Sequence, residues 1–276
     1  MNKLEILKTL ILGIIQGFTE FLPISSSAHL VIFEKLLNEH FSSIFFEVLV
    51  HLGTLIAILV VFWKDLSKLV KSFVNWMRNG FSFRENDFEA KRDVRLVLFI
   101  ILATIPTAII GVLFKEKIEE IFHSVKLVGF MLIVTGIILI MSKINQDKAH
   151  KKIENMSPFE AILIGIVQGM AILPGISRSG STISIGLFQK LDREFAAKFS
   201  FYLSIPAVIG ACILKSLDLT KSDLSSIPVM LPGFVAAIIT GILAIKILLK
   251  HISKGKFYLY SIWCFIAGLF TIIFLN

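Results

Sequence analysis

The chain has 276 residues, of which 55% are hydrophobic and only 17% are charged, and its formal net charge is +8. Soluble domains usually carry about 25% charged residues, so this composition excludes an ordinary soluble domain and indicates an integral membrane protein. Basic cytoplasmic loops explain the positive charge of such a protein, and we therefore expect no nucleic acid as a partner.

The first apolar stretch, residues 4–37, is interrupted by polar and helix-breaking residues. The interruptions are Gln16, Glu20, Pro23, Ser25, Ser26, Ser27 and His29. Proline removes a backbone donor, and serine side chains compete for local backbone hydrogen bonds, so one continuous spanning helix is disfavoured. The pattern predicts a re-entrant hairpin of two short helices that enters and leaves the membrane on the same side. Irregular backbone at this depth requires surrounding protein or a water-filled cavity.

Three uninterrupted apolar segments follow this hairpin, at residues 42–63, 96–114 and 125–143. Each is close to the length of about 20 residues that an α-helix needs to cross the hydrocarbon layer. The connection 64–95 is rich in charged residues. It predicts a short amphipathic surface helix and a loop.

A second broken stretch, residues 159–189, repeats features of the first. Gly13-Ile-Ile-Gln-Gly17 matches Gly165-Ile-Val-Gln-Gly169, and a Leu-Pro pair follows in both copies. Three plain apolar segments again come afterwards, at residues 195–215, 228–249 and 257–275. Because an odd number of spans separates the two hairpins, the second must enter from the opposite face.

These patterns predict an all-α polytopic membrane protein with a single integral membrane domain. We expect an inverted-topology repeat in which each half is a re-entrant helical hairpin plus three transmembrane helices, with repeat 1 at about 1–157 and repeat 2 at about 158–276. On this topology one side carries eighteen Lys and Arg residues and the other eight. The positive-inside rule then places the basic side in the cytoplasm and both termini outside.

The first break holds three candidate catalytic residues, Glu20, Ser26 and His29, and two hydroxyls that are candidates for binding a substrate phosphate, Ser25 and Ser27. Gln16 and Glu20 are four residues apart and so share one face of a helix. Ionisable side chains within the membrane are costly and usually functional. The alternative is that Glu20 and His29 only satisfy backbone groups at the hairpin tip.

The second break has the composition of an anion-binding loop. Ser177, Ser179 and Thr182 offer hydroxyl donors, and we expect the next helix to begin near Thr182 with free N–H groups. Arg178 adds a permanent charge and a planar fork suited to phosphate oxygens. A purely structural alternative is that Arg178 neutralises Glu20 across the repeat interface.

A further pair, Glu47 and His51, lies four residues apart near the outer end of the first plain span. The two side chains are candidates for lining the same cavity. The alternative, equally weighted, is a satisfied pair at the membrane interface, and the spacing alone is weak support for a metal site.

At these two breaks the sequence resembles the bacterial undecaprenyl-diphosphate phosphatases, also called bacitracin-resistance proteins. The segment from Gln16 to His29, Gln-Gly-Phe-Thr-Glu-Phe-Leu-Pro-Ile-Ser-Ser-Ser-Ala-His, is similar to the family's (Glu/Gln)-x-x-x-Glu signature with its following serines and histidine. The segment from Pro174 to Thr182, Pro-Gly-Ile-Ser-Arg-Ser-Gly-Ser-Thr, resembles its Pro-Gly-x-Ser-Arg-Ser-x-x-Thr signature. Gln16 stands where some members carry Glu, and an amide can act neither as a base nor as an anionic metal ligand.

The resemblance implies hydrolysis of undecaprenyl diphosphate to undecaprenyl phosphate and inorganic phosphate, which recycles the lipid carrier of cell-wall synthesis and gives bacitracin resistance. It implies dependence on Mg²⁺ or Ca²⁺ and a place in the bacterial cytoplasmic (inner) membrane. A polyprenyl diphosphate lipid and the bilayer are then the expected partners. A homodimer is a further expectation.

On this reading Arg178 and the N–H groups around Ser177–Thr182 clamp the diphosphate, while Glu20 holds the metal with Gln16 as a neutral ligand. The nucleophile is either Ser26, activated by Glu20 or His29, or a water molecule for which His29 is the acid or base. A rival function is lipid-phosphate flipping or anion transport, because inverted repeats with broken helices are common in transporters.

Overall fold

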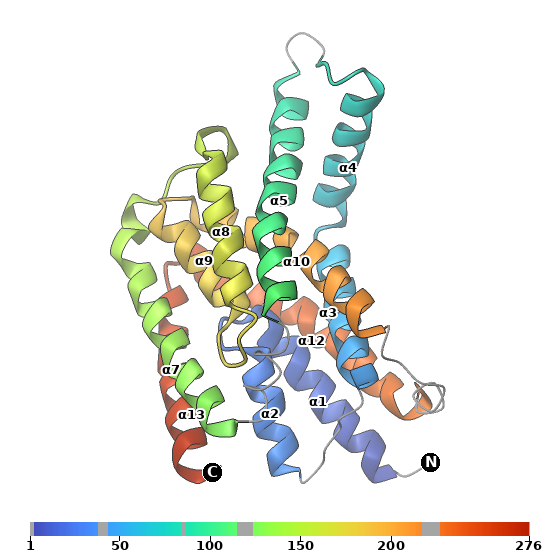
Figure 1. The fold of residues 1–276 in the computed structure, drawn as a ribbon, viewed down its shortest axis with the longest axis vertical. Coiled ribbons are helices and arrows are strands. Elements are labelled where there is room, and N and C mark those ends of the chain that lie inside the picture. The colour runs from blue at the N-terminus through green and yellow to red at the C-terminus, as the bar shows by residue number, and fades with distance from the viewer. Residues whose placement is uncertain (1–2, 38–43, 84–86, 115–123, 217–226, 276) are drawn as a thin grey trace.

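The computed structural model describes residues 3–37, 44–83, 87–114, 124–216 and 227–275, and it consists almost entirely of helices (Figure 1). Within these ranges the only β-type pairing is an isolated bridge between Lys151 and Leu191. Five described helices are long and apolar enough to cross a membrane, and a bent sixth also qualifies. The protein is therefore an all-α, multi-pass membrane protein, as the sequence predicts.

Both interrupted stretches form helical hairpins. The first is α1 (Lys3–Phe21) followed by α2 (Ser26–Leu36), and the second is α8 (Pro158–Met170) followed by α9 (Arg178–Phe188). In Figure 1 the first hairpin approaches the centre of the molecule from the bottom and the second approaches it from the top. The tips of the two hairpins meet in the middle.

Each hairpin breaks where the backbone takes a conformation that a helix cannot continue. Ser25 has a φ of 67° in the first tip, and Gly175 has a φ of 96° in the second. The next helix then starts at a serine cap, because the Ser25 side chain accepts a hydrogen bond from the Ala28 N–H and Ser177 accepts one from the Gly180 N–H. The predicted breaks are confirmed.

The plain apolar segments all form helices. They are α3 (Ile44–Val61), α5 (Phe88–Leu113), α7 (Val125–Met141), α10 (Arg193–Ser216), α12 (Ile227–Ser253) and α13 (Tyr260–Phe274). α1 begins and α13 ends at the same end of the molecule (Figure 1). Three connections between these helices, residues 38–43, 115–123 and 217–226, lie outside the described residues.

The charged connection after α3 forms the expected amphipathic helix, α4 (Trp63–Arg78), bent by 81° from α3. The start of α5 differs from the prediction, because the helix begins at Phe88 rather than near residue 96. Its charged first turns are stabilised outside the apolar part: Asp87 caps the Ala90 N–H at 3.0 Å, and Ser72 of α4 donates to Asp93 at 3.1 Å.

The repeated Gly-x-x-Gln-Gly pattern marks close helix packing. A Cβ atom added to Gly13 of α1 would lie 2.0 Å from the Gly233 carbonyl oxygen of α12, and one added to Gly165 of α8 would lie 2.0 Å from the Ala103 oxygen of α5. Small residues allow such helices to approach closely within a membrane. These matched contacts support the predicted repeat, whose inverted orientation relative to a membrane stays a prediction.

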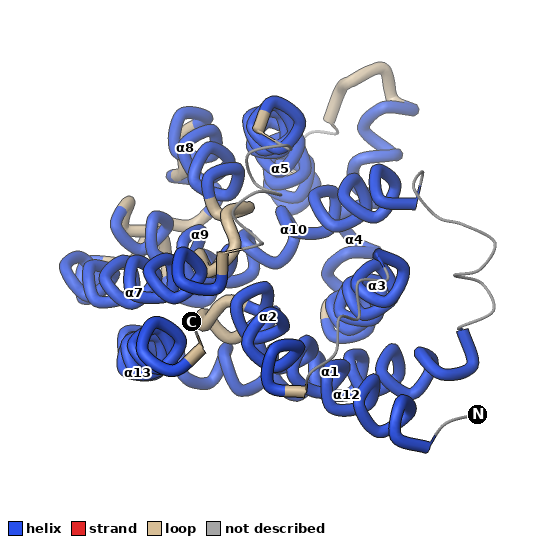
Figure 2. Tube along the Cα trace, turned by 60° about the horizontal axis from the view of Figure 1, so that its bottom comes forward, coloured by secondary structure: helices blue, strands red, loops and turns tan. Residues whose placement is uncertain are grey.

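The second helix of the first hairpin, α2, lies inside the bundle. In both views α2 is placed between the α7–α13 pair on one side and α3 on the other (Figure 2). Apolar residues of α2 such as Ala28 and Ile32 pack against Val128 and Leu132 of α7. The polar tip is thus enclosed by protein, which is the condition under which irregular backbone persists at membrane depth.

Candidate active site

The Glu20 carboxylate joins the two hairpins. Arg178 donates to its Oε1 at 2.5 Å, while Ser26 at 2.6 Å and the Gln16 amide at 3.1 Å donate to its Oε2. The Glu20 side chain is 8% exposed and that of Arg178 is 17% exposed. The structure therefore brings Gln16, Glu20, Ser26 and Arg178 together, and Arg178 does neutralise Glu20 across the interface between the hairpins.

Helix geometry explains how these side chains meet. Gln16 and Glu20 are one turn apart near the end of α1, so both point to the same side. Ser26 is the first residue of α2, and Arg178 is the first residue of α9. Two helix N-termini, each with free N–H groups and a positive dipole end, thus begin beside Glu20.

The start of the second of these helices corrects one expectation. α9 begins at Arg178 and not near Thr182, because the Ser177 cap and the Gly180 N–H already close the first turn. Thr182 consequently lies inside the helix, where its hydroxyl donates to the Arg178 carbonyl at 2.8 Å and lies 2.6 Å from the Ser200 hydroxyl of α10. Its side chain is engaged with its own helix and α10.

Most of the other predicted phosphate-binding hydroxyls hold the hairpin tips. Ser25 and Ser177 cap their helices, as described above. Ser27 accepts a hydrogen bond from the Gly175 N–H at 3.3 Å, which ties the first tip to the second. Ser179 donates to the Leu22 carbonyl at 3.5 Å, a second link between the tips. These bonds fix the relative position of the two breaks.

Several buried polar atoms in the described part of the chain have no hydrogen-bond partner, and two of them belong to residues that contact Glu20. They are Nη1 of Arg178 and Oε1 of Gln16. Buried polar groups in native proteins are almost always satisfied, so each orphan atom calls for an explanation. The guanidinium nitrogen suits an anionic oxygen, and the amide oxygen suits a cation or a donor.

The donor set is compatible with a hard divalent cation. Among the described residues no group of three or more His, Cys, Asp or Glu side chains could hold a metal. Mg²⁺, however, is commonly bound through one or two carboxylates together with waters and substrate phosphates. The Glu20 carboxylate and the unpartnered Gln16 oxygen fit that requirement.

Of the predicted pair Glu47 and His51, only the His51 side chain lies close to the Glu20 carboxylate. The His51 Nε2 atom lies 3.9 Å from Glu20 Oε2, and its Nδ1 atom is 2.8 Å from the Glu47 carbonyl oxygen. The Glu47 carboxylate pairs with Lys215 of α10. His51 therefore lines the site, whereas Glu47 belongs to an ion pair beside it.

The sequence did not predict the pairing of Lys215 with Glu47, because 168 residues separate the two and no local pattern marks the pair.

His29 is turned away from this cluster. Its Nδ1 atom is 2.8 Å from the Ser25 carbonyl oxygen, and its Nε2 atom accepts a hydrogen bond from the Trp263 indole at 2.8 Å. The residue is 4% exposed. Both ring nitrogens are thus engaged away from Glu20. Trp263 is far from His29 along the chain, so no local sequence pattern marks this contact.

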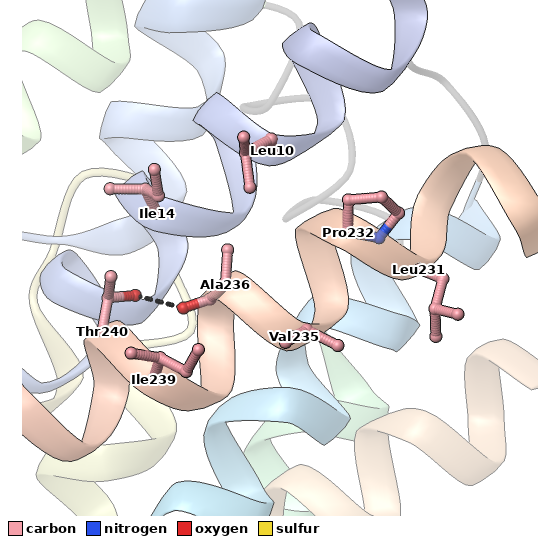
Figure 3. Close-up of a pocket in the computed structure, with 8 residues that line it drawn as sticks. All are labelled: Leu10, Ile14, Leu231, Pro232, Val235, Ala236, Ile239 and Thr240. Carbon is pink, nitrogen blue, oxygen red and sulfur yellow. Dashed lines mark hydrogen bonds between the residues drawn. The ribbon is translucent and has the colours of Figure 1, made fainter.

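An apolar groove of about 590 Å³ lies on the outside, between α1 and α12 (Figure 3). It is lined by Leu10, Ile14, Leu231, Pro232, Val235, Ala236, Ile239 and Thr240. The one hydroxyl, on Thr240, donates to the Ala236 carbonyl of its own helix. The groove has no ionisable side chain, so the chemistry belongs to the Glu20 cluster.

Comparisons with known proteins show the family to which the chain belongs. A family model described as "Bacitracin resistance protein BacA" matches residues 9–270. A protein of Methanosphaera stadtmanae named "Undecaprenyl-diphosphatase" is 42% identical over 273 residues, which cover 98% of each chain. Proteins of the same name from Desulforapulum autotrophicum and Halothermothrix orenii are each 40% identical over 272 residues, again covering 98% of both chains. The chain therefore belongs to the bacitracin-resistance protein family.

Proposed function

We propose that this protein hydrolyses undecaprenyl diphosphate to undecaprenyl phosphate and inorganic phosphate. The reaction recycles a lipid carrier for cell-wall synthesis and gives resistance to bacitracin. The names of its relatives support this activity. The observation that carries it is the cluster of Glu20, Ser26 and Arg178, a base, a hydroxyl and a cation enclosed within an apolar membrane protein.

The diphosphate is bound at the N-termini of α2 and α9. Arg178 uses Nη2 for Glu20, and its unpartnered Nη1 is available to a phosphate oxygen. The free N–H groups at the two helix starts add partial positive charge, which also favours an anion. Positioning and charge neutralisation are the main contributions that a protein makes to phosphoryl transfer.

Ser26 is the nucleophile in this proposal. Its hydroxyl donates to Glu20 Oε2, so Glu20 takes the proton as Ser26 Oγ attacks the terminal phosphorus. The bond from that phosphorus to the bridging oxygen breaks, and undecaprenyl phosphate leaves. Water then hydrolyses the phosphoserine, releasing inorganic phosphate and restoring the Ser26 hydroxyl. His29 is less suited to act as the base, because both its nitrogens are engaged elsewhere.

We further propose that Mg²⁺ or Ca²⁺ is held by Glu20 and the Gln16 amide oxygen. The cation would supply positive charge that neutralises the diphosphate. Arg178 and the helix N-termini supply the remaining positive potential from the chain itself.

The membrane placement is also a proposal beyond the multi-pass fold. The excess of Lys and Arg around α4 and the start of α5 supports a cytoplasmic position for that end. The protein then lies in the cytoplasmic membrane with both termini outside, and the α1–α2 hairpin opens outward. A homodimer stays a prediction.

Purified protein in detergent tests the activity, because transport cannot occur there. We expect release of inorganic phosphate from a polyprenyl diphosphate, loss of release on chelation of divalent cations, and loss in Arg178→Ala. Arg78→Ala, an exposed arginine at the end of α4, is the matched control. Folded protein that releases no phosphate would favour the rival function, transport of a lipid phosphate or an anion.

A further inference from the structure

The hydrogen bond between Trp263 and His29 fixes the protonation of a buried histidine. An indole N–H can only donate, so the Nε2 atom of His29, 2.8 Å away, must be an acceptor and carries no proton. The proton of the neutral ring is then on Nδ1, which donates to the Ser25 carbonyl at 2.8 Å. A doubly protonated ring would direct an N–H at the indole N–H.

The surroundings of His29 reinforce this tautomer. The two aromatic rings are nearly coplanar, with centroids 6.1 Å apart and planes 13° apart, as expected for an in-plane N–H···N bond between their edges. On its other sides α2 packs against apolar residues of α7, among them Val128 and Leu132. No charged group contacts the His29 ring within the described part of the chain, so Trp263 and the Ser25 carbonyl are its polar partners.

The accepting carbonyl belongs to the residue that sets the geometry of the first tip. Ser25 has a φ of 67°, in the left-handed region that costs energy for any residue with a side chain. Such a conformation persists only where the surroundings fix it. The His29 side chain and backbone N–H both donate to the Ser25 carbonyl, and the Ala28 N–H donates to the Ser25 hydroxyl.

The peptide that follows Ser25 leads directly into the site. Ser26 comes next, with its hydroxyl 2.6 Å from Glu20, and Ser27 accepts a hydrogen bond from Gly175 of the second tip. A rotation of the Ser25 carbonyl would therefore displace the Ser26 hydroxyl from the Glu20 carboxylate.

We propose that Trp263 is a positioning residue, which holds His29 as the neutral Nδ1–H tautomer and so fixes Ser25 and aligns Ser26 with Glu20. Its kinetic consequence rests on the proposed hydrolase function. Trp263 is about half exposed on the outer surface of α13, so replacing its indole removes a donor without opening the core. His29 acts here as a donor and not as a proton shuttle.

Two sets of variants test the kinetic consequence. Trp263→Phe keeps an aromatic ring at this position and removes the donor, and we expect kcat for phosphate release to fall about 10- to 100-fold while KM changes little. Trp63→Phe, an exposed tryptophan at the start of α4, is the matched control. His29→Asn keeps a donor near the Nδ1 position, so it should retain at least about tenfold more kcat than His29→Ala.

Equal loss in His29→Asn and His29→Ala, or a Trp263→Phe enzyme as active as Trp63→Phe, would contradict the proposal.

An NMR measurement tests the tautomer without any activity. In protein labelled with ¹⁵N at its six histidines, His29 is identified by the signal missing from His29→Asn. We expect a protonated Nδ1 and a bare Nε2 at neutral pH in the wild type, and a change of tautomer in Trp263→Phe. A wild-type His29 protonated on Nε2 would overturn the proposal. If the folded wild-type protein releases no phosphate while the NMR result holds, the hydrolase proposal fails and the tautomer assignment stands.

Discussion

The two hairpin tips share a backbone design and differ in the side chains they present. In both, a residue with positive φ precedes a helix that is capped by serine. The first tip contributes the anion Glu20 and the hydroxyl of Ser26, whereas the second contributes the cation Arg178. Two copies of one structural element have thus become complementary, and neither tip forms the cluster alone.

The most damaging way to break this complementarity is to remove Arg178. Arg178→Ala leaves the Glu20 carboxylate buried without its counter-ion, and we expect activity to fall about 10³- to 10⁵-fold. The free energy of unfolding should fall by about 3–5 kcal/mol, which denaturant titration in detergent measures. Glu20→Gln combined with Arg178→Ala should recover part of that stability, since no unpaired charge remains. A double variant less stable than Arg178→Ala would contradict the pairing.

Removing the Ser26 hydroxyl should lower the catalytic rate without lowering the stability of the fold. Ser26→Ala should lower kcat for phosphate release by about 100-fold or more and leave the unfolding transition nearly unchanged. Brief reaction with labelled substrate followed by acid quenching should trap a phosphoserine in the wild type and none in the variant. If Ser26→Ala keeps most of kcat, water is the nucleophile. Ser67→Ala on the exposed face of α4 is the control.

The packing of the two hairpin helices should be equally sensitive in both copies. Gly13→Ala and Gly165→Ala each place a methyl group against the backbone of a neighbouring helix, so each should destabilise the protein by about 1–3 kcal/mol or more. Gly210→Ala, where the added atom meets nothing within 4 Å, should be neutral or stabilising. A large effect in one hairpin only would show that the two halves are not packed alike.

The smallest effects should come from the two serine caps. Ser177→Ala should cost about 1 kcal/mol of stability through the loss of the bond from the Gly180 N–H. Ser25→Ala should cost more, because alanine must also keep the positive φ without the cap. Thermal unfolding of the two variants measures both losses of stability. A larger loss in Ser177→Ala than in Ser25→Ala would contradict the strain assigned to Ser25.

The sequence was sufficient to predict the hairpins, the spans and the main members of the cluster. Pro23 and Pro174 interrupt otherwise apolar runs, and Glu20 and Arg178 are rare residue types at that depth. Such signals are local. The partners of Glu47 and His29, which are Lys215 and Trp263, come from helices far along the chain, and no periodicity marks those contacts.

The first residues of two helices were also predicted wrongly from the sequence. α5 and α9 begin before their expected positions, because side chains at Asp87 and Ser177 close the first turn. Caps of this kind extend a helix into polar sequence, where the hydrophobic pattern gives no signal. For α9 the difference moved Thr182 into the helix interior and left Arg178 at the helix start.

The central claim is that Glu20 of one hairpin and Arg178 of the other form a single site. A double-mutant cycle on kcat/KM for phosphate release, with Glu20→Gln, Arg178→Ala and both together, tests it directly. We predict that the double variant is no less active than the worse single variant, because either change already disables the shared site. Losses that multiply in the double variant would mean that the two residues act independently and would contradict the claim.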